Sequence, residues 1–97
     1  MTAPKLPAQA TANICNTRGL HARASAKFVK LASTYDAEVC VTRDGVTVNA
    51  LSIMGLLMLG AGNGCAIDIS AEGAQAEAAG AVAALADLVG RRFDEDQ

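Results

Sequence analysis

The stretch that decides the fold lies between positions 37 and 49 and reads Ala37-Glu38-Val39-Cys40-Val41-Thr42-Arg43-Asp44-Gly45-Val46-Thr47-Val48-Asn49. Over 37–42, Val39 and Val41 alternate with polar side chains, which predicts a strand with one buried face. The dipeptide Asp44-Gly45 suits the positive φ angles of a tight turn, and 46–49 follows as the returning strand. The stretch therefore predicts an antiparallel β-hairpin.

A helix is expected on each side of this hairpin. Before it, apolar residues recur with helical spacing over 22–33, where the pattern is carried by Phe28, Val29 and Ala32. After it, Ser52 is a suitable N-cap for a short apolar helix over 53–59, which ends in a glycine-rich loop. The hairpin is thus flanked by an amphipathic helix and a short apolar one.

Three further elements complete the predicted fold. Residues 11–15 form a weakly alternating first strand, and 66–71 form a fourth strand with Ile67 and Ile69 facing the core. A last helix spans about 74–92, with its apolar face formed by Ala78, Val82, Leu85 and Val89. The order βαββαβα predicts an α+β fold, an open-faced two-layer sandwich in which three helices cover one face of a four-stranded antiparallel sheet.

The 97 residues are expected to form one domain over 10–93, preceded by a flexible segment over 1–9 and followed by a solvated acidic tail over 94–97. A net charge of −2 without a basic stripe argues against a nucleic-acid partner. The sequence contains no signal peptide and no apolar stretch of membrane-spanning length, so we expect a cytoplasmic protein. Its three cysteines are interpreted as small buried hydrophobic residues in strands.

Metal and nucleotide chemistry receive little support. A single histidine and scattered cysteines cannot supply a zinc site of the usual composition. The glycines of the loop at 60–64 lack the dinucleotide-binding spacing and precede a strand rather than a helix. We expect no metal and no cofactor.

The single histidine, His21, lies where a glycine-containing turn leads into the predicted helix over 22–33. A lone histidine is often a surface or structural residue. Here, however, the helix start offers unpaired backbone N–H groups, Gly19 permits a close backbone approach, and Arg23 can pair with phosphate. The helix N-terminus also disfavours the imidazolium form, which leaves a ring nitrogen free as a nucleophile. The three features suit an imidazole that carries a phosphoryl group.

Two separated motifs, Gly19-Leu20-His21-Ala22-Arg23 and Val48-Asn49-Ala50-Leu51-Ser52-Ile53-Met54-Gly55, resemble the HPr family of histidine-containing phosphocarrier proteins. The similarity extends over roughly residues 11–90, and the predicted βαββαβα order matches the fold of the family. The family commonly has proline after the arginine, whereas this chain has Ala24. In this departure the chain resembles carriers of the nitrogen-related branch of the phosphotransferase system.

The resemblance implies a covalent carrier, rather than an independent enzyme, in the phosphoenolpyruvate-dependent phosphotransferase system. Enzyme I would phosphorylate His21 on Nδ1, and the group would pass to a histidine of an enzyme IIA domain. The Ala22 backbone and the Arg23 guanidinium would share the charge of the phosphoryl group. The family also implies a monomer without a membrane or nucleic-acid partner.

Ser52 has two compatible interpretations. It is the N-cap of the helix over 53–59, and it corresponds to the serine that an HPr kinase/phosphorylase modifies in some relatives, although Leu51 stands where many of them have lysine. A phosphate at Ser52 would place negative charge beside the partner surface and weaken docking to enzyme I.

The helix over 53–59 is apolar on every side, so a single sheet face cannot bury all of it. It is either an unusually apolar core helix or a docking patch, for which we expect Ile53, Met54, Leu56 and Leu57 with a charged rim of Arg18, Arg23 and Lys30. A second hypothesis for function follows from it: a non-transferring regulatory module that binds other proteins through this helix. A small-molecule-binding domain would need a polar pocket that the sequence does not indicate.

Overall fold

The computed structural model describes residues 8–95, and its elements follow the predicted order. A short 3₁₀ turn, η1, follows the last helix and was not predicted from the sequence. In chain order the elements are β1 (Ala8–Asn13), α1 (Ala22–Ala32), β2 (Ala37–Arg43), β3 (Val46–Asn49), α2 (Ile53–Met58), β4 (Ala66–Gly73), α3 (Gln75–Gly90) and η1 (Arg92–Asp94). The predicted α+β class and the βαββαβα order are confirmed.

The four strands form one antiparallel sheet in the order β1-β4-β2-β3. The central pair brings Val41 opposite Ile69, and both side chains are fully buried. The β2–β3 hairpin has the predicted geometry, since Asp44 and Gly45 adopt φ angles of 50° and 80°. The two-residue turn therefore fixes the register of the hairpin, and the alternation in the sequence determines which face of the sheet is buried.

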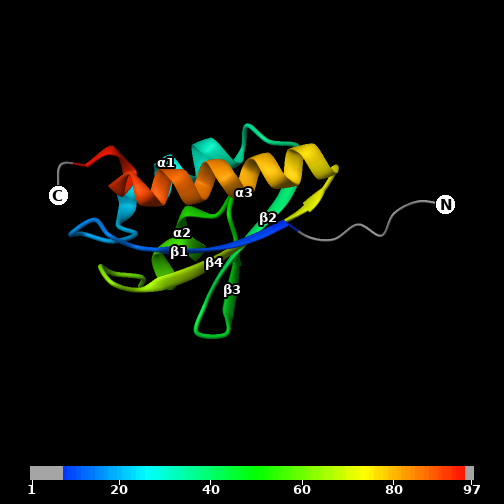
Figure 1. Cartoon of the computed structure of the whole chain (residues 1–97). Coiled ribbons are helices and arrows are strands. Elements are labelled where there is room, and N and C mark those ends of the chain that lie inside the picture. The colour runs from blue at the N-terminus through cyan, green and yellow to red at the C-terminus, as the bar shows by residue number, and fades with distance from the viewer. Residues whose placement is uncertain (1–7, 96–97) are drawn as a thin grey trace.

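Helices α1 and α3 lie across one face of the sheet, as Figure 1 shows, and α2 packs against α1 and β3. The predicted core face of α3 is correct, because Ala78, Val82, Leu85 and Val89 are all buried. The largest fully buried side chains are Phe28 of α1 and Phe93 of η1. The core is thus built from small aliphatic residues and two phenylalanines.

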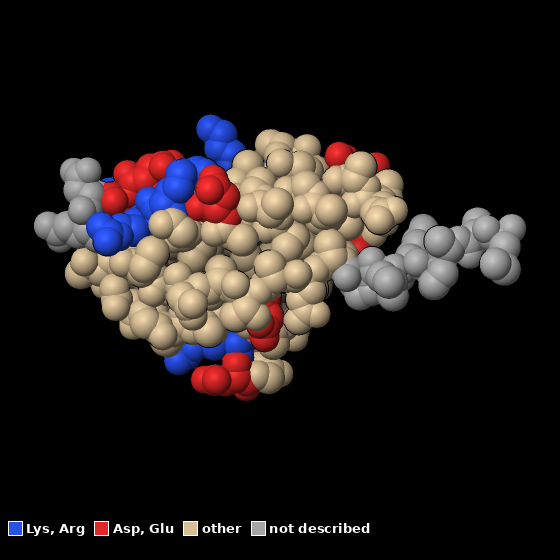
Figure 2. All heavy atoms as spheres, in the orientation of Figure 1, with Lys and Arg blue, Asp and Glu red and all other residues tan. Residues whose placement is uncertain are grey.

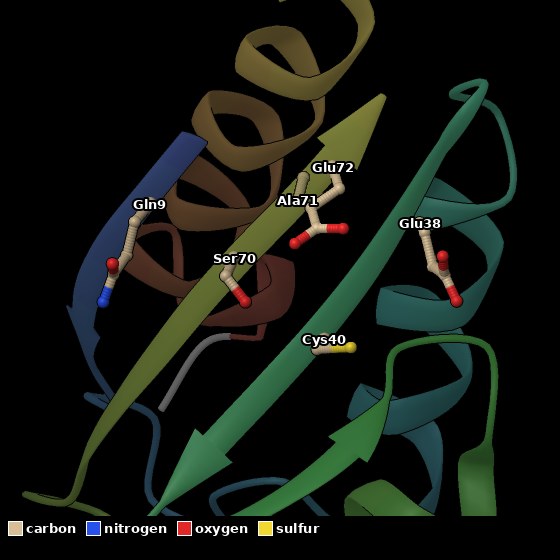
Figure 3. A pocket seen from close by; sticks show the side chains of 6 residues that line it. All are labelled: Gln9, Glu38, Cys40, Ser70, Ala71 and Glu72. Atoms are coloured by element: carbon tan, nitrogen blue, oxygen red, sulfur yellow. The ribbon is translucent and has the colours of Figure 1, made fainter. Parts of the chain in front are cut away.

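The opposite face of the sheet is open and polar. A depression on this face is lined by residues from three adjacent strands, which Figure 3 labels as Gln9, Glu38, Cys40, Ser70, Ala71 and Glu72. Within residues 8–95 no group of three or more histidine, cysteine or acidic side chains is arranged to hold a metal ion. None of the helices in that range has the length and apolar character needed to cross a membrane.

The predicted bounds of the first strand and of the flexible segment before it are wrong. The strand was expected at 11–15, after a flexible segment over 1–9, but it runs from Ala8 to Asn13, and Ala8 and Gln9 pair with Ala71 and Ser70 of β4. The weak alternation of this segment could not reveal its partner strand, which sets the register. Residues 1–7, the rest of the predicted flexible segment, lie outside the described residues.

The interpretation of the cysteines also needs correction. Cys15 and Cys65 lie outside the strands, and Cys40 is on the outer face of β2. Cys15 is exposed, with its thiol 3.4 Å from the carbonyl oxygen of Val89, while Cys40 and Cys65 are partly exposed. All three are free thiols, and none is fully buried, although the partly buried Cys65 packs against the core.

Candidate functional site

The loop before α1 is held by a close approach between two glycine-containing segments. Gly19 has φ +64°, and a Cβ at this position would lie 2.5 Å from the carbonyl oxygen of Ala61. The next residue, Leu20, donates its backbone N–H to the same oxygen at 2.9 Å. Only glycine fits both the backbone conformation and the contact. The glycine-rich loop therefore positions the segment that leads to His21.

His21 is the N-cap residue of α1, with extended backbone angles of φ −74° and ψ −179°. The first hydrogen bond of the helix joins the N–H of Ser25 to the carbonyl oxygen of His21 at 2.8 Å. The N–H groups of Ala22, Arg23 and Ala24 therefore have no partner within the helix. They form a concentration of donors and partial positive charge beside the imidazole.

The imidazole is tied to the other end of the chain. Its Nε2 lies 2.5 Å from Oε2 of Glu95, and these side chains are only 15% and 13% exposed. The second oxygen of Glu95 accepts a hydrogen bond of 2.9 Å from Nδ2 of Asn16. Asn16 is itself fully buried, and the same amide nitrogen donates to the carbonyl oxygen of Gly19 at 2.9 Å. Asn16, Glu95 and His21 thus form a continuous hydrogen-bonded network.

Glu95 is held in its ionised form. Desolvation, the largest single influence, would raise the pKa of its carboxyl group. Hydrogen bonds from Asn16 and His21, together with the electrostatic influence of His21 and Arg23, outweigh it and lower that pKa below its ordinary value. An ionised carboxylate only accepts hydrogen bonds, so Nε2 of His21 is the donor. Within residues 8–95, Nδ1 makes no hydrogen bond with a protein side chain or backbone group.

Glu95 is held in place by an unusual backbone turn. Arg92, Phe93 and Asp94 have φ angles of 59°, 54° and 60°, a left-handed run that is rare for residues other than glycine. The turn is anchored by the buried Phe93 ring and by Lys27, whose Nζ donates to the carbonyl oxygen of Phe93 at 2.7 Å. These contacts outweigh the conformational cost of the turn and direct Glu95 toward His21.

Residues 94–97 were expected to form a solvated acidic tail, and for Glu95 that expectation is wrong. Asp94 does remain exposed and pairs with Arg91, which also pairs with Asp87. Charged side chains of both signs gather at this end of the molecule, beside the end of the described chain (Figure 2). The sequence showed only a short run of acidic residues, with no feature to distinguish the one that faces His21. Residues 96 and 97 lie outside the described part.

The three predicted rim cations, Arg18, Arg23 and Lys30, are exposed. Among residues 8–95 none of them forms an ion pair, because the cations that do are Arg43, Arg91 and His21. The charge of Arg23 nevertheless acts on Glu95, which places this guanidinium near the histidine network. Ala24, where the family commonly has proline, lies in the first turn of α1 and is buried. Its N–H has no intrahelical partner, so either residue is compatible with this position.

Helix α2 begins as predicted. Ser52 is its N-cap, and its Oγ accepts a hydrogen bond from the N–H of Gly55 at 2.9 Å. Of the predicted docking residues, Ile53, Met54 and Leu57 are 42%, 66% and 36% exposed. Leu56 is fully buried, so its assignment to the docking surface is wrong. The helix is apolar on all sides, and only its contacts with α1 and β3 determine which side faces the core.

Comparison with known proteins supports the resemblance. A family model described as "PTS HPr component phosphorylation site" matches residues 8–91. The phosphocarrier protein HPr of Neisseria meningitidis serogroup A is 46% identical over 84 residues, which cover 87% of this chain and 92% of that protein. The phosphocarrier protein NPr of Shewanella violacea is 44% identical over 91 residues, which cover 94% and 96%. HPr and NPr relatives thus match almost equally well.

A solved structure agrees with the sequence relatives. The crystal structure of HPr-C-His from Thermoanaerobacter tengcongensis superimposes with a TM-score of 0.86 at 40% identity, and the match covers 92% of this chain and 98% of that one. The sequence relatives and the solved structure therefore indicate the same family. The chain belongs to the HPr family and is a phosphocarrier protein of the phosphotransferase system.

Proposed function

We propose that His21 is the residue that accepts the phosphoryl group from enzyme I and passes it to an enzyme IIA histidine. One observation carries the proposal: Glu95 occupies Nε2, whereas Nδ1 is left without a partner in the described chain at the N-cap of α1. A nitrogen with a free electron pair beside unpaired backbone donors is suited to form a bond to phosphorus.

The backbone N–H of Ala22 and the guanidinium of Arg23 are the groups that we assign to the phosphoryl oxygens. Both belong to the first turn of α1, and the Arg23 side chain is exposed and free to reorient. An exposed guanidinium binds an anion weakly enough to release it. This suits a carrier, which has to hold the phosphoryl group at a free energy close to that in both of its partners.

Enzyme I and enzyme IIA are assigned to a surface that we call the α2 patch, made of Ile53, Met54, Leu57 and Met58. These apolar side chains are exposed and belong to one short helix that contacts α1. Exposed apolar residues are typical of a protein–protein interface, and we assign the exposed Arg18, Arg23 and Lys30 to its charged rim. Methionine, with its flexible side chain, allows one surface to fit several partners.

Regulation and cellular context follow from the same proposal. Ser52 lies at the edge of the α2 patch, where phosphorylation by an HPr kinase/phosphorylase would add charge to the docking surface. We expect the protein to act as a monomer in the cytoplasm, where phosphoenolpyruvate is produced and consumed.

The test is phosphorylation of the full chain by enzyme I and phosphoenolpyruvate, with the forms of enzyme I from the sugar and nitrogen branches assayed separately. The expected product is an acid-labile, alkali-stable phosphohistidine at position 21, and the faster enzyme I identifies the branch. Labelling that persists in His21→Ala would refute the assignment. The non-transferring module would be supported instead by three results together. The wild type would transfer no phosphoryl group, partner binding would survive His21→Ala, and partner binding would be lost in Met54→Asp.

A further inference from the structure

We propose that Glu95 is a positioning residue for phosphoryl transfer, because its carboxylate holds the proton on Nε2 of His21 and keeps Nδ1 unprotonated for attack on phosphorus. The inference rests on the proposed role of His21 and adds a residue to it. Glu95 touches neither the phosphoryl group nor the partner nucleophile in this proposal. It acts only through the imidazole.

The first support is the contact between Nε2 of His21 and Oε2 of Glu95. A neutral imidazole carries one proton, which resides on either Nδ1 or Nε2. The partner of Nε2 is a carboxylate 2.5 Å away that can only accept a hydrogen bond. This contact stabilises the tautomer in which Nε2 carries the proton and Nδ1 carries the electron pair.

The second support is that the carboxylate is fixed at both oxygens. Oε2 faces His21, while Oε1 accepts a hydrogen bond from Asn16. The orientation of the Asn16 amide is determined, because the opposite orientation would bring its oxygen against the Gly19 carbonyl and the Glu95 carboxylate. Within residues 8–95 the buried Oδ1 of Asn16 has no hydrogen-bond partner. An unsatisfied acceptor of this kind costs free energy, and such costs concentrate at functional sites.

The third support is the turn that carries Glu95. Three successive residues with positive φ are unfavourable, and they are retained here because Phe93 is inserted into the core and Lys27 binds its carbonyl oxygen. The end of the chain is therefore built into the fold rather than lying by chance near the imidazole. The arrangement has the same logic as a carboxylate that orients the histidine of a catalytic triad.

The proposed chemistry balances over both transfers. In the first, the electron pair on Nδ1 of His21 forms the N–P bond, while the P–N bond of phospho-enzyme I breaks and its electron pair stays on the donor nitrogen. The ring of His21 then carries a positive charge, with the proton still on Nε2, and the Glu95 carboxylate pairs with that charge. The imidazolium that forms is stabilised without any proton leaving the site.

In the second transfer the Nδ1–P bond breaks and its electron pair returns to Nδ1, as the enzyme IIA histidine forms the new bond to phosphorus. Since Nε2 has kept its proton, the leaving group is a neutral imidazole rather than an imidazolide. Loss of that proton would leave a much poorer leaving group. The same contact therefore supports both acceptance and release of the phosphoryl group.

The test compares Glu95→Gln with the wild type in the full chain. Asn16 donates to Oε1 of residue 95, so the amide oxygen of the variant should stay on Asn16 and its NH2 group should face Nε2 of His21. That NH2 group donates a hydrogen bond, which favours the tautomer with the proton on Nδ1. We expect ¹⁵N NMR of the neutral ring to show the Nε2-protonated tautomer in the wild type and a shift toward the Nδ1-protonated tautomer in the variant. The kcat of phosphorylation by enzyme I should fall about 10-fold or more, and 10- to 100-fold is the range for residues that orient metal-ligating histidines. The KM should stay unchanged.

Asp94→Asn is the matched control, because it removes one carboxylate from the same turn and asparagine tolerates the left-handed φ of 60°. It should leave both the tautomer and kcat unchanged. Wild-type kcat or a single unchanged tautomer in Glu95→Gln would overturn the inference, and a faster variant would show that Glu95 opposes phosphorylation by charge repulsion. Each of these outcomes leaves the labelling of His21 intact, whereas labelling in His21→Ala would instead overturn the proposed function.

Discussion

Nε2 of His21 lies 2.5 Å from Oε2 of Glu95, although 74 positions separate the two residues in the chain. Asn16, five positions before the histidine, completes the arrangement by binding the other oxygen of the carboxylate. The segment before α1 and the turn after α3 are thereby joined at the site. Variants that remove the Asn16 amide or the Glu95 carboxylate should therefore affect both stability and phosphoryl transfer.

The contact makes stability depend on pH. The pKa of Glu95 is lower in the folded protein than its ordinary value of 4.5, so the folded state binds its proton less readily than the unfolded chain. Its stabilising contribution is present above that ordinary value and disappears as the pH falls through the lower pKa of the folded state. Urea unfolding at several pH values should show a gap between wild type and Glu95→Gln at neutral pH that closes in acid. A gap that is constant across this range would contradict the prediction.

Phe93 should determine whether Glu95 reaches the histidine. Its side chain is fully buried, and Phe93→Ala should cost about 3–5 kcal/mol of unfolding free energy. Leu85→Ala, at an equally buried position in α3, should cost a comparable 2–5 kcal/mol or so without moving the turn.

Under conditions where both proteins are folded, only Phe93→Ala should alter the ¹⁵N shifts of the His21 ring and reduce the rate of phosphorylation. Equal effects of the two variants on the ring would show that general destabilisation, rather than release of the turn, is responsible.

Gly19 should not tolerate a side chain. Gly19→Ala combines a left-handed φ with a collision against the Ala61 carbonyl oxygen, so it should destabilise the protein by clearly more than 1 kcal/mol and slow transfer by displacing His21. Gly45 has a similar φ of +80° with no atom within 4 Å of the added Cβ, so Gly45→Ala should cost only the conformational strain of about 1–2 kcal/mol. Denaturation curves of the two variants give the unfolding free energy that each one loses. A larger loss in Gly19→Ala is expected from the collision, and equal losses would argue against it.

The two roles of Ser52 can be separated by three substitutions. Ser52→Ala removes the cap and should cost about 1 kcal/mol of stability. Asparagine and aspartate both retain capping ability, but only aspartate adds negative charge beside the α2 patch. The Kd for enzyme I should therefore rise in Ser52→Asp and stay near the wild-type value in Ser52→Asn. Equal affinities in these two variants would mean that charge at this position does not control docking.

Met54 and Leu56 are close together in α2, but their substitutions should have different effects. Met54 is 66% exposed, so Met54→Asp should preserve the fold and raise the Kd for enzyme I about tenfold or more. Leu56→Ala should instead cost about 2–5 kcal/mol of stability, because its side chain is fully buried. Ala83→Asp, on the exposed side of α3, is the control for added charge and should leave binding unchanged. Calorimetry and thermal unfolding distinguish these outcomes, and unchanged binding by Met54→Asp would remove the patch from the interface.

The sequence was most informative where structure depends on nearby residues. The β2–β3 hairpin followed from a two-residue turn between alternating strands, and the start of α2 followed from Ser52, which caps a group three positions away. His21 was also recognisable, because glycine, histidine and arginine stand close together at a helix start. These features depend on spacings of a few residues, which a sequence displays directly.

Tertiary structure alone decided the features that depend on distant residues. It determined that Leu56 of an all-apolar helix faces the core, that β1 pairs with β4 from Ala8 onward, and that Cys15 is exposed. Above all, it placed Glu95 against His21 through a left-handed turn that no local preference favours. Contacts across more than 70 positions arise from burial of Phe93 and the packing around it. The sequence by itself thus identified the histidine and the fold, whereas the packed chain decided which carboxylate holds that histidine.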